Sequence, residues 1–348
     1  MSQFDLDLVG DDAGAAPLVS VIMVTFNHER YLHEAVNGVL MQVTDFPLEL
    51  LIGDDCSNDG TLALALALQR KHPHIIRVLS SDRNTGLSEN YARLIRASRG
   101  EFIAYCEGDD FWTRPDKLKR QVAYLQAHPD TGAVHTDFDH IVWRNGNWVR
   151  HANFLRHWSQ GRPIEQGNVF HDLLRRNVIQ VCTLCFRADL GRRCLEEGGL
   201  KVSYVVNDWP LCLYIAAHSK IAFFDESTAV YRKVPGSITN SGYAARVSFL
   251  RSQIDIVEDV CVRFGVDDAD RVRSLSGTQR ALASVALLAN DESEFDRTYS
   301  WLEVNAPEFA RSWRGRLLPW IAKSRLGRAS ARFIHSLRVR RREATEYR

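Results

Sequence analysis

The residues with the clearest chemical meaning form an acidic turn at positions 107–112, with the sequence EGDDFW. Its three carboxylates, Glu107, Asp109 and Asp110, follow directly on the apolar run 102–106. Carboxylates this close repel one another unless a cation or hydrogen-bond donors offset their charge. Mg²⁺ and Mn²⁺ prefer oxygen ligands, and Mg²⁺ often shares them with substrate phosphates. The spacing favours a metal-bound diphosphate here over a plain surface turn.

The elements that would position this turn alternate between strand and helix. Apolar runs predict strands at 19–25, where most residues are β-branched, and at 48–53, 75–79 and 101–106. Helices are predicted at 31–41, at 62–68 and from 88 onward. The 62–68 segment alternates like a strand, but its Ala and Leu residues and the preceding cap residues favour a helix. This alternation predicts an α/β fold with a parallel, doubly wound sheet.

Polar side chains follow the end of each of these four strands. They are Asn27, Asp54, Asp55, Arg83, Asn84, Glu107 and Asp109. In open α/β sheets the carboxyl ends of the strands form the edge where ligands bind. We therefore expect these side chains to meet at one site, although Asp54 and Asp55 could instead only cap the next helix.

The second half of the chain predicts a mixed structure. We expect helices at 117–127, 169–174 and 207–217, strands at 132–135, 178–187, 221–224 and 229–232, a hairpin at Asn145-Gly146, and a loop over the site at 151–167. After about residue 240 the pattern is helical. We therefore predict an acidic lead at 1–17, an α/β domain at 18–240 and a helical region at 241–348.

Composition points to an ordinary globular protein. The 348 residues are 45% hydrophobic and 25% charged, with a net charge of +1, which gives no reason to expect nucleic acid binding. The first residues are acidic, whereas a signal peptide begins with basic residues and continues with an apolar region. No run reaches the roughly 18 apolar residues that a membrane-spanning helix needs. Seven scattered cysteines favour a reducing compartment, so we expect a cytoplasmic location.

In this order and spacing the motifs resemble family 2 glycosyltransferases with the GT-A fold, over about residues 18–238. The matching segments are 19–27, 52–61, 84–86, 107–112, 207–209 and 231–232. The resemblance implies a Rossmann-like, mixed but mostly parallel sheet. It also implies transfer of a sugar from a nucleotide-diphosphate donor, such as a UDP- or dTDP-sugar, to an acceptor hydroxyl with inversion, in the biosynthesis of a surface polysaccharide or glycoconjugate.

The resemblance also implies roles for individual residues. The residues matched to the donor site are Thr25, Asn27, Glu29, Asp54, Arg83, Asn84, Gly86 and Glu107. Of these, Asp54 would accept a hydrogen bond from the base. Asp109 would bind Mg²⁺ or Mn²⁺, and Asp208 would be the catalytic base, although it could also serve only as a helix cap.

The chain departs from the family pattern at two positions. Glu107 stands where many members have Asp, and both residues supply oxygen ligands. Val234 stands where some members place a histidine that can complete the metal or phosphate site, so phosphate contacts would fall to Arg232 or Lys233. Cys182 and Thr183 are expected near the acceptor.

Other functions fit the residues less well. A nucleotidyltransferase that makes sugar nucleotides would carry a Gly-rich basic loop after the first strand, which 25–30 lacks. A non-catalytic nucleotide-sugar-binding protein would not need both an acidic metal motif and a separate base. The spacing of Cys182 and Cys185 suggests zinc, but no second pair with ligand spacing exists.

The last 38 residues are strongly basic, with 12 Lys or Arg and two Glu between 311 and 348. Aromatic and aliphatic residues alternate with these charges across 311–342, as in helices that lie on anionic membranes. A peripheral location on the inner membrane face is therefore one expectation, with a glycan or lipid-linked acceptor. The alternative is a solvated helix packed on the protein.

Overall fold

A computed structural model describes residues 6–7, 16–144, 146–234 and 242–323. The chain divides into two compact units, Met1–Val234 and Pro235–Arg348. The first unit contains all of the strands within these described ranges, and the second contains helices.

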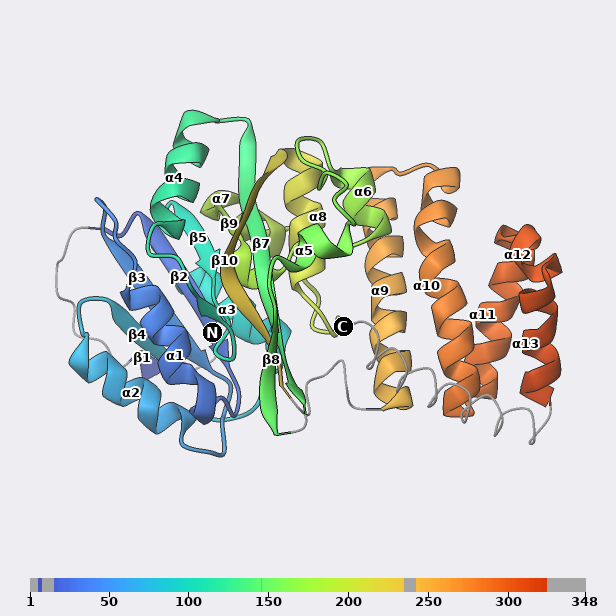
Figure 1. Cartoon of the computed structure of the whole chain (residues 1–348), viewed down its shortest axis with the longest axis horizontal. Coiled ribbons are helices and arrows are strands. Elements are labelled where there is room, and N and C mark those ends of the chain that lie inside the picture. The colour runs from blue at the N-terminus through green and yellow to red at the C-terminus, as the bar shows by residue number, and fades with distance from the viewer. Residues whose placement is uncertain (1–5, 8–15, 145, 235–241, 324–348) are drawn as a thin grey trace. The chain divides into compact units, whose positions relative to one another are not determined.

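The first unit is built on a ten-stranded sheet (Figure 1). Its strands are β1 (Leu6–Asp7), β2 (Val19–Thr25), β3 (Leu48–Asp54), β4 (Ile76–Ser80), β5 (Phe102–Tyr105), β6 (Phe111–Trp112), β7 (Thr131–Arg144), β8 (Asn147–His151), β9 (Cys185–Arg187) and β10 (Lys220–Lys233). The order across the sheet is β1-β4-β3-β2-β5-β9-β7-β10-β6, and β8 pairs with β7.

The predicted parallel strands are confirmed, and their ends are aligned. Strands β4, β3, β2 and β5 are parallel neighbours. Thr25, the last residue of β2, pairs with Asp54, the last residue of β3, and Asp54 pairs with Ser80 at the end of β4. This register brings the loops after the strands to one edge of the sheet.

Helices cover both faces of this sheet. The helices of the first unit are α1 (Glu29–Leu40), α2 (Thr61–Lys71), α3 (Leu87–Ala97), α4 (Lys117–Ala127), α5 (Phe154–Trp158), α6 (Phe170–Arg175), α7 (Ala188–Glu196) and α8 (Asp208–His218). The buried faces of α1, α2 and α4 pack on one side with Val21, Met23 and Ile52. On the other side Tyr91 of α3 stacks near Tyr105 of β5, with ring centroids 4.9 Å apart.

The second half of the sheet is mixed, as predicted, but two boundaries were wrong. The strand expected at 178–187 is a 3₁₀ turn, Val181–Thr183, followed by the short strand β9. The two strands expected at 221–224 and 229–232 form one strand, β10, whose pairing with β7 shifts between Phe224 and Ala229. Such irregularities interrupt the alternation of apolar and polar side chains along a strand. The single strand β10 therefore resembles two strands in the sequence.

The predicted hairpin is confirmed, because β7 and β8 pair antiparallel on either side of residue 145. The region 151–167 is not entirely a loop, since it contains the short helix α5. No helix was predicted at the position of α7, which begins immediately after β9.

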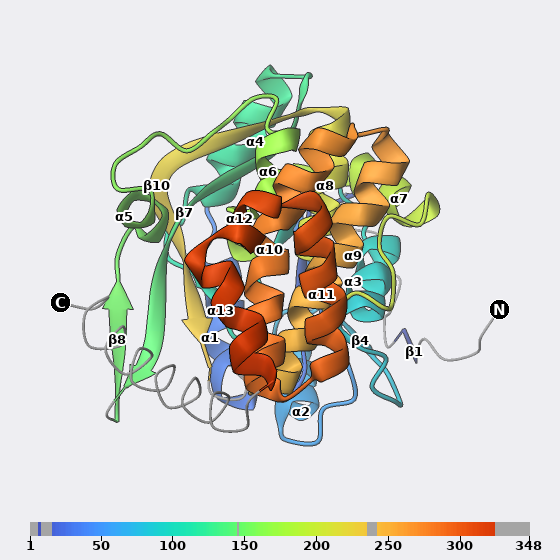
Figure 2. The ribbon, with the colours of Figure 1, turned by 90° about the vertical axis from the view of Figure 1, so that its right-hand side faces the viewer.

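The second unit contains α9 (Tyr243–Phe264), α10 (Asp268–Ala289), α11 (Glu292–Asn305), α12 (Pro307–Arg311) and α13 (Trp313–Lys323). Successive helices lie side by side in chain order (Figures 1 and 2). The carboxylates of Asp267 and Asp291 cap α10 and α11 by accepting hydrogen bonds from Asp270 and Glu294 backbone N–H groups, which satisfies donors at each helix start.

The predicted amphipathic tail at 311–342 is only partly described, because residues 324–348 lie outside the described ranges. Within α13, Leu318 and Ile321 pack on the apolar core of the second unit, whereas Leu317 and Trp320 are exposed. Across the part of the chain that the structure describes, no helix has both the length and the apolar character needed to cross a membrane.

Candidate active site

The loops after β2 and β3 are joined by hydrogen bonds between their backbones and side chains. The Asn27 backbone N–H donates to the Ser57 hydroxyl (2.9 Å), and the Asn58 N–H donates to the Asn27 side-chain oxygen (2.9 Å). Asn27 has a φ of +58°, a left-handed conformation that Asn tolerates better than most residues. Glu29 accepts from the Gly60 N–H (3.2 Å), so the two loops form one hydrogen-bonded platform.

Asp54 is fully buried within this platform. Its carboxylate accepts hydrogen bonds from the Thr25 hydroxyl (3.3 Å), the Ser57 hydroxyl (2.6 Å) and the Ser57 N–H (3.0 Å). The predicted donor residues Thr25 and Asp54 are therefore in contact, and Asp54 also fixes the start of its own loop.

Asp55 connects this platform to the loop after β4. Its carboxylate accepts from the N–H and hydroxyl of Thr85 and from the N–H of Gly86, all within 2.8 Å. Gly86 has a φ of +86°, which favours glycine. The neighbouring Arg83 and Asn84 are exposed. The predicted donor-lining loop is thus attached to the sheet edge through Asp55.

The acidic turn lies against the first loop. A Cβ at Gly108 would come within 2.6 Å of the Thr25 methyl carbon and 2.8 Å of His28 Nδ1, so only glycine fits this approach. His28 Nε2 is 4.0 Å from Asp109 Oδ2. The Tyr91 hydroxyl donates to Glu107 Oε1 at 2.7 Å. Thr25, His28, Glu107 and Asp109 are therefore neighbours.

Arg232 fixes the far side of this turn. Its guanidinium donates to the Asp109 backbone oxygen (2.7 Å) and to Glu34 (2.5 Å), and its backbone N–H donates to the Asp110 carboxylate (2.8 Å). The Arg232 side chain is only 4% exposed and lies over the ring of Phe111. Its interactions support the turn, so Arg232 is already occupied as an anchor for Asp109 and Asp110.

Asp208 comes from a segment about a hundred residues later, which is attached to the start of α3, the helix that also supports Glu107 through Tyr91. Asp208 is the first residue of α8, and its carboxylate accepts a hydrogen bond from the Asn177 side chain (3.2 Å). The preceding Asn207 donates to Ser88 at the start of α3 (2.6 Å), which holds this helix end in place. Asp208 is half-buried.

The carboxylates affect one another's ionisation. Burial, then repulsion from Asp109 and, more weakly, from Asp208, raises the pKa of Glu107 to about 8. Burial raises the pKa of Asp208 as well, against hydrogen bonds that lower it. Burial followed by repulsion from Asp109 and Glu107 also raises the pKa of Asp110. These shifts favour the protonated, neutral forms of the carboxyls, and a bound cation would favour the ionised forms instead.

A divalent cation fits this environment, provided that a substrate supplies further ligands. Among the described residues, no group of three His, Cys, Asp or Glu side chains lies close enough to hold a metal by itself. Asp109 and the adjacent imidazole of His28, whose Nδ1 is buried without a partner, offer two ligand types. Mg²⁺ sites often combine one or two carboxylates with substrate phosphates and water.

Sequence reasoning missed the partners of the predicted residues. His28, Tyr91 and Asn177 lie beside Asp109, Glu107 and Asp208 respectively. His28 could have been found from its position, because it directly follows Asn27 at the end of β2. Tyr91 and Asn177 lie on other elements, and no local pattern marks them.

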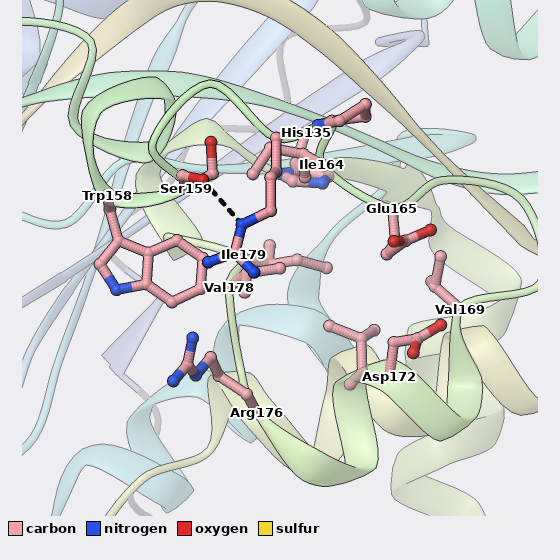
Figure 3. A pocket seen from close by; sticks show the side chains of 13 residues that line it. His135, Trp158, Ser159, Ile164, Glu165, Val169, Asp172, Arg176, Val178 and Ile179 are labelled. Carbon is pink, nitrogen blue, oxygen red and sulfur yellow. Dashed lines mark hydrogen bonds between the residues drawn. The ribbon is translucent and has the colours of Figure 1, made fainter.

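A cavity of about 460 Å³ lies in the first unit (Figure 3). One of its lining residues, Leu173, accepts a hydrogen bond from Trp209, which directly follows Asp208. The cavity is lined by parts of α5, α6 and the expected site loop, including Trp158, Glu165 and Arg176. Cys182 and Thr183 do not line it. Both are fully buried, and their backbone oxygens accept hydrogen bonds from Trp112 and Gln121.

Comparison with known families agrees with this geometry. Residues 20–192 match the family model described as Glycosyl transferase family 2. The matched range contains the acidic turn and the three strand-end loops before it. Residues 20–192 therefore belong to that glycosyltransferase family, as the resemblance of the motifs predicted.

Curated relatives support the same placement. An uncharacterised protein of Mycobacterium bovis, Mb1547, is 31% identical over 232 residues, which are 66% of this chain and 63% of that protein. A dTDP-rhamnosyl transferase of Shigella flexneri, RfbG, is 31% identical over 144 residues, which are 40% of this chain and 43% of that protein. The chain therefore spans less than two thirds of each of these relatives.

Solved structures confirm the GT-A fold. The mannosyltransferase PcManGT from Pyrobaculum calidifontis, in complex with GDP-Man and Mn²⁺, superposes with a TM-score of 0.57 and 18% identity. The alignment covers 94% of this chain and 90% of that structure. The similarity includes a curled, mixed and mostly parallel sheet with helices, as the sequence predicted.

Proposed function

We propose that this protein transfers a glycosyl residue from a nucleoside-diphosphate sugar to an acceptor hydroxyl, with inversion, in polysaccharide or glycoconjugate biosynthesis. One observation carries the proposal. Asp208 and the acidic turn are attached to the same helix, α3, although about a hundred residues separate them. Asn207, next to Asp208, donates to Ser88 of α3, and Tyr91 of α3 donates to Glu107. A displacement at a sugar carbon requires such a pair, with one group near the leaving diphosphate and another near the attacking hydroxyl.

In this mechanism Asp208 accepts the proton of the acceptor hydroxyl as its oxygen attacks the anomeric carbon. The bond from that carbon to the diphosphate breaks, and the nucleoside diphosphate leaves with the electron pair. When bound, Mg²⁺ or Mn²⁺ supplies positive charge that stabilises the leaving diphosphate. Asp109 would hold the cation, and Glu107, fixed by Tyr91, would face the donor.

The donor would lie along the edge formed by the loops after β2, β3 and β4. We propose that Thr25, Asn27 and Glu29 border the nucleotide. Asp54 was expected to contact the base, but it is fully buried, so it would instead support the loop on which the base lies. Exposed Arg83 and Asn84, with Gly86, would line the donor. The resemblance favours a UDP- or dTDP-sugar, and the Shigella relative is named for a dTDP-sugar. The Pyrobaculum structure binds GDP-Man with Mn²⁺, so GDP-sugars belong in the test.

A thermal-shift screen tests this proposal. We expect one class of nucleotide sugar to raise the unfolding temperature in Mn²⁺ or Mg²⁺, because a ligand at about 100 times its Kd adds about 2.7 kcal/mol to stability. For a domain of this size that corresponds to a shift of about 5–10 °C. EDTA should abolish the shift. If no nucleotide sugar stabilises the protein with either cation, the proposed donor site is wrong.

We also propose that the basic segment 311–342 binds anionic membranes, which would bring the enzyme to a lipid-linked acceptor on the inner face. Exposed Leu317 and Trp320, beside Arg316, are the described residues that favour this idea. Full-length protein should sediment with phosphatidylserine vesicles, and a chain ending near residue 310 should not. Equal sedimentation of the two would exclude a membrane role for the segment.

A further inference from the structure

The cavity beside α6 has features of a ligand site that the donor and catalytic residues do not explain. Figure 3 shows Trp158 and Arg176 on one side and Glu165 and Asp172 on the other. Its volume of about 460 Å³ is within the range of about 300–1,000 Å³ found for small-molecule pockets. All of its lining residues belong to the first unit.

One wall of this cavity also holds the proposed catalytic base. Leu173 lines the cavity, while its backbone oxygen accepts a hydrogen bond from the Trp209 indole at 2.8 Å. Asn177 donates to Asp208, and its side-chain oxygen accepts from the N–H of Ile179, another lining residue (3.0 Å). A molecule in the cavity would therefore lie against the segment that positions Asp208.

A buried polar group in the lining has no partner. His135 is 1% exposed, lines the cavity, and its Nδ1 makes no hydrogen bond. Leaving such a group unsatisfied costs about 1–3 kcal/mol, so a ligand that bonds to it gains that energy. Burial also lowers the pKa of His135 to about 3, so the imidazole is neutral at physiological pH. A neutral imidazole suits a hydroxyl group better than an anion.

The remaining lining residues also favour a neutral, hydroxyl-bearing ligand. The two arginines, Arg162 and Arg176, are balanced by two carboxylates, Glu165 and Asp172, so the lining carries no excess charge. Trp158 is 40% exposed and offers an aromatic surface, with the Arg176 guanidinium 4.3 Å from its ring centre. Sugars combine apolar C–H faces with hydroxyl edges, and this mixture of aromatic and paired charged groups matches both.

We propose that this cavity is an acceptor subsite, which binds a neutral sugar unit of the glycan that receives the transferred residue. This inference rests on the proposed transferase function, because it assigns the substrate next to Asp208. Trp158 would stack on the sugar ring, and His135, Glu165 and Asp172 would bind its hydroxyls. The subsite would select the acceptor without taking part in bond cleavage.

Saturation-transfer NMR on the full chain tests the subsite without any donor. The probes are the methyl glycosides of glucose, galactose, rhamnose and N-acetylglucosamine, with methyl glucuronide and inorganic phosphate for comparison. We expect at least one neutral glycoside to bind, and Trp158→Ala to weaken that binding about tenfold. Glu165→Gln, on the opposite wall and exposed, should weaken it as well.

Trp143→Ala is the matched control, because Trp143 is 48% exposed and lies in the same unit as the cavity but does not line it. It should leave the glycoside signal unchanged. Equal saturation-transfer signals from the neutral glycosides with the wild type and Trp158→Ala, whether strong or absent, would overturn the subsite. Stronger binding of methyl glucuronide or phosphate than of the neutral glycosides would also overturn it. The thermal shift with nucleotide sugars is read separately and should survive in Trp158→Ala. A failed donor screen is thereby distinguished from a failed subsite.

Discussion

Asp208→Asn is expected to reduce sugar transfer by about 10²–10⁴-fold, because the amide cannot accept the proton of the attacking hydroxyl. The substitution keeps the shape of the side chain and an oxygen that can accept from Asn177. We therefore expect little change in donor affinity or in the thermal shift with nucleotide sugar and cation. The measurement is kcat for transfer, with the KM for donor in the same experiment.

Asp189→Asn provides a control for this substitution. Asp189 also lies in the first turn of a helix, α7, but it is exposed and outside the site. Both changes remove a carboxylate from a helix start, which costs about 0.3–1 kcal/mol of helix stability. Asp189→Asn should retain full activity. If Asp208→Asn is equally active, Asp208 is only a helix residue and the base assignment is wrong.

Asp109→Asn is expected to abolish the cation-dependent part of donor binding and to lower transfer by about 10²-fold or more. An amide is a weaker ligand for a hard cation than a carboxylate, and Asp109 Oδ2 lies 4.0 Å from His28 Nε2. Isothermal titration of Mn²⁺ in the presence of nucleoside diphosphate measures this loss directly. Asp45→Asn, an exposed carboxylate beside Lys119, is the control and should bind as the wild type does.

The same variant should not destabilise the protein in the absence of metal. Burial and then Asp109 raise the pKa of Glu107 from 4.5 to about 8. A carboxyl with a raised pKa in the folded state loses stability as pH rises from about 4.5 through about 8. Removing the Asp109 charge lowers the pKa of Glu107 and reduces that loss. The measurement is the unfolding temperature of both proteins at pH 8 without metal. A lower unfolding temperature for Asp109→Asn than for the wild type would contradict this electrostatic description.

Much of this site could be predicted because the first four strands follow local rules. The β-branched run at 19–25 and the apolar run at 48–53 indicate buried parallel strands, and the register of these strands aligns Thr25 with Asp54. Parallel neighbouring strands end at the same edge of a sheet, so the residues that follow them lie close together once the sheet has formed. The position of Asp208 came from resemblance, since nothing local connects it with residues 107–109.

The remaining features depend on packing that a single sequence does not encode locally. β10 is one strand with register shifts, so its side-chain alternation breaks near Asp225. Arg232 is one of the two residues, with Lys233, that the sequence assigns to phosphate, but it is buried beneath the acidic turn and donates to the Asp109 carbonyl. Tyr91 reaches Glu107 from α3 because of the fold. The cavity likewise combines α5, α6 and β7 residues that are distant in sequence.

The most direct test of the account is release of nucleoside diphosphate by wild type and Asp208→Asn, measured side by side. Both proteins are incubated with UDP-, dTDP- and GDP-sugars in Mn²⁺ or Mg²⁺, with the methyl glycosides as acceptors. We predict release and a glycosylated product for the wild type with one donor class. EDTA should stop both, and Asp208→Asn should lower both by at least about 10²-fold. Failure of every donor, or equal rates for the two proteins, would contradict the proposed mechanism.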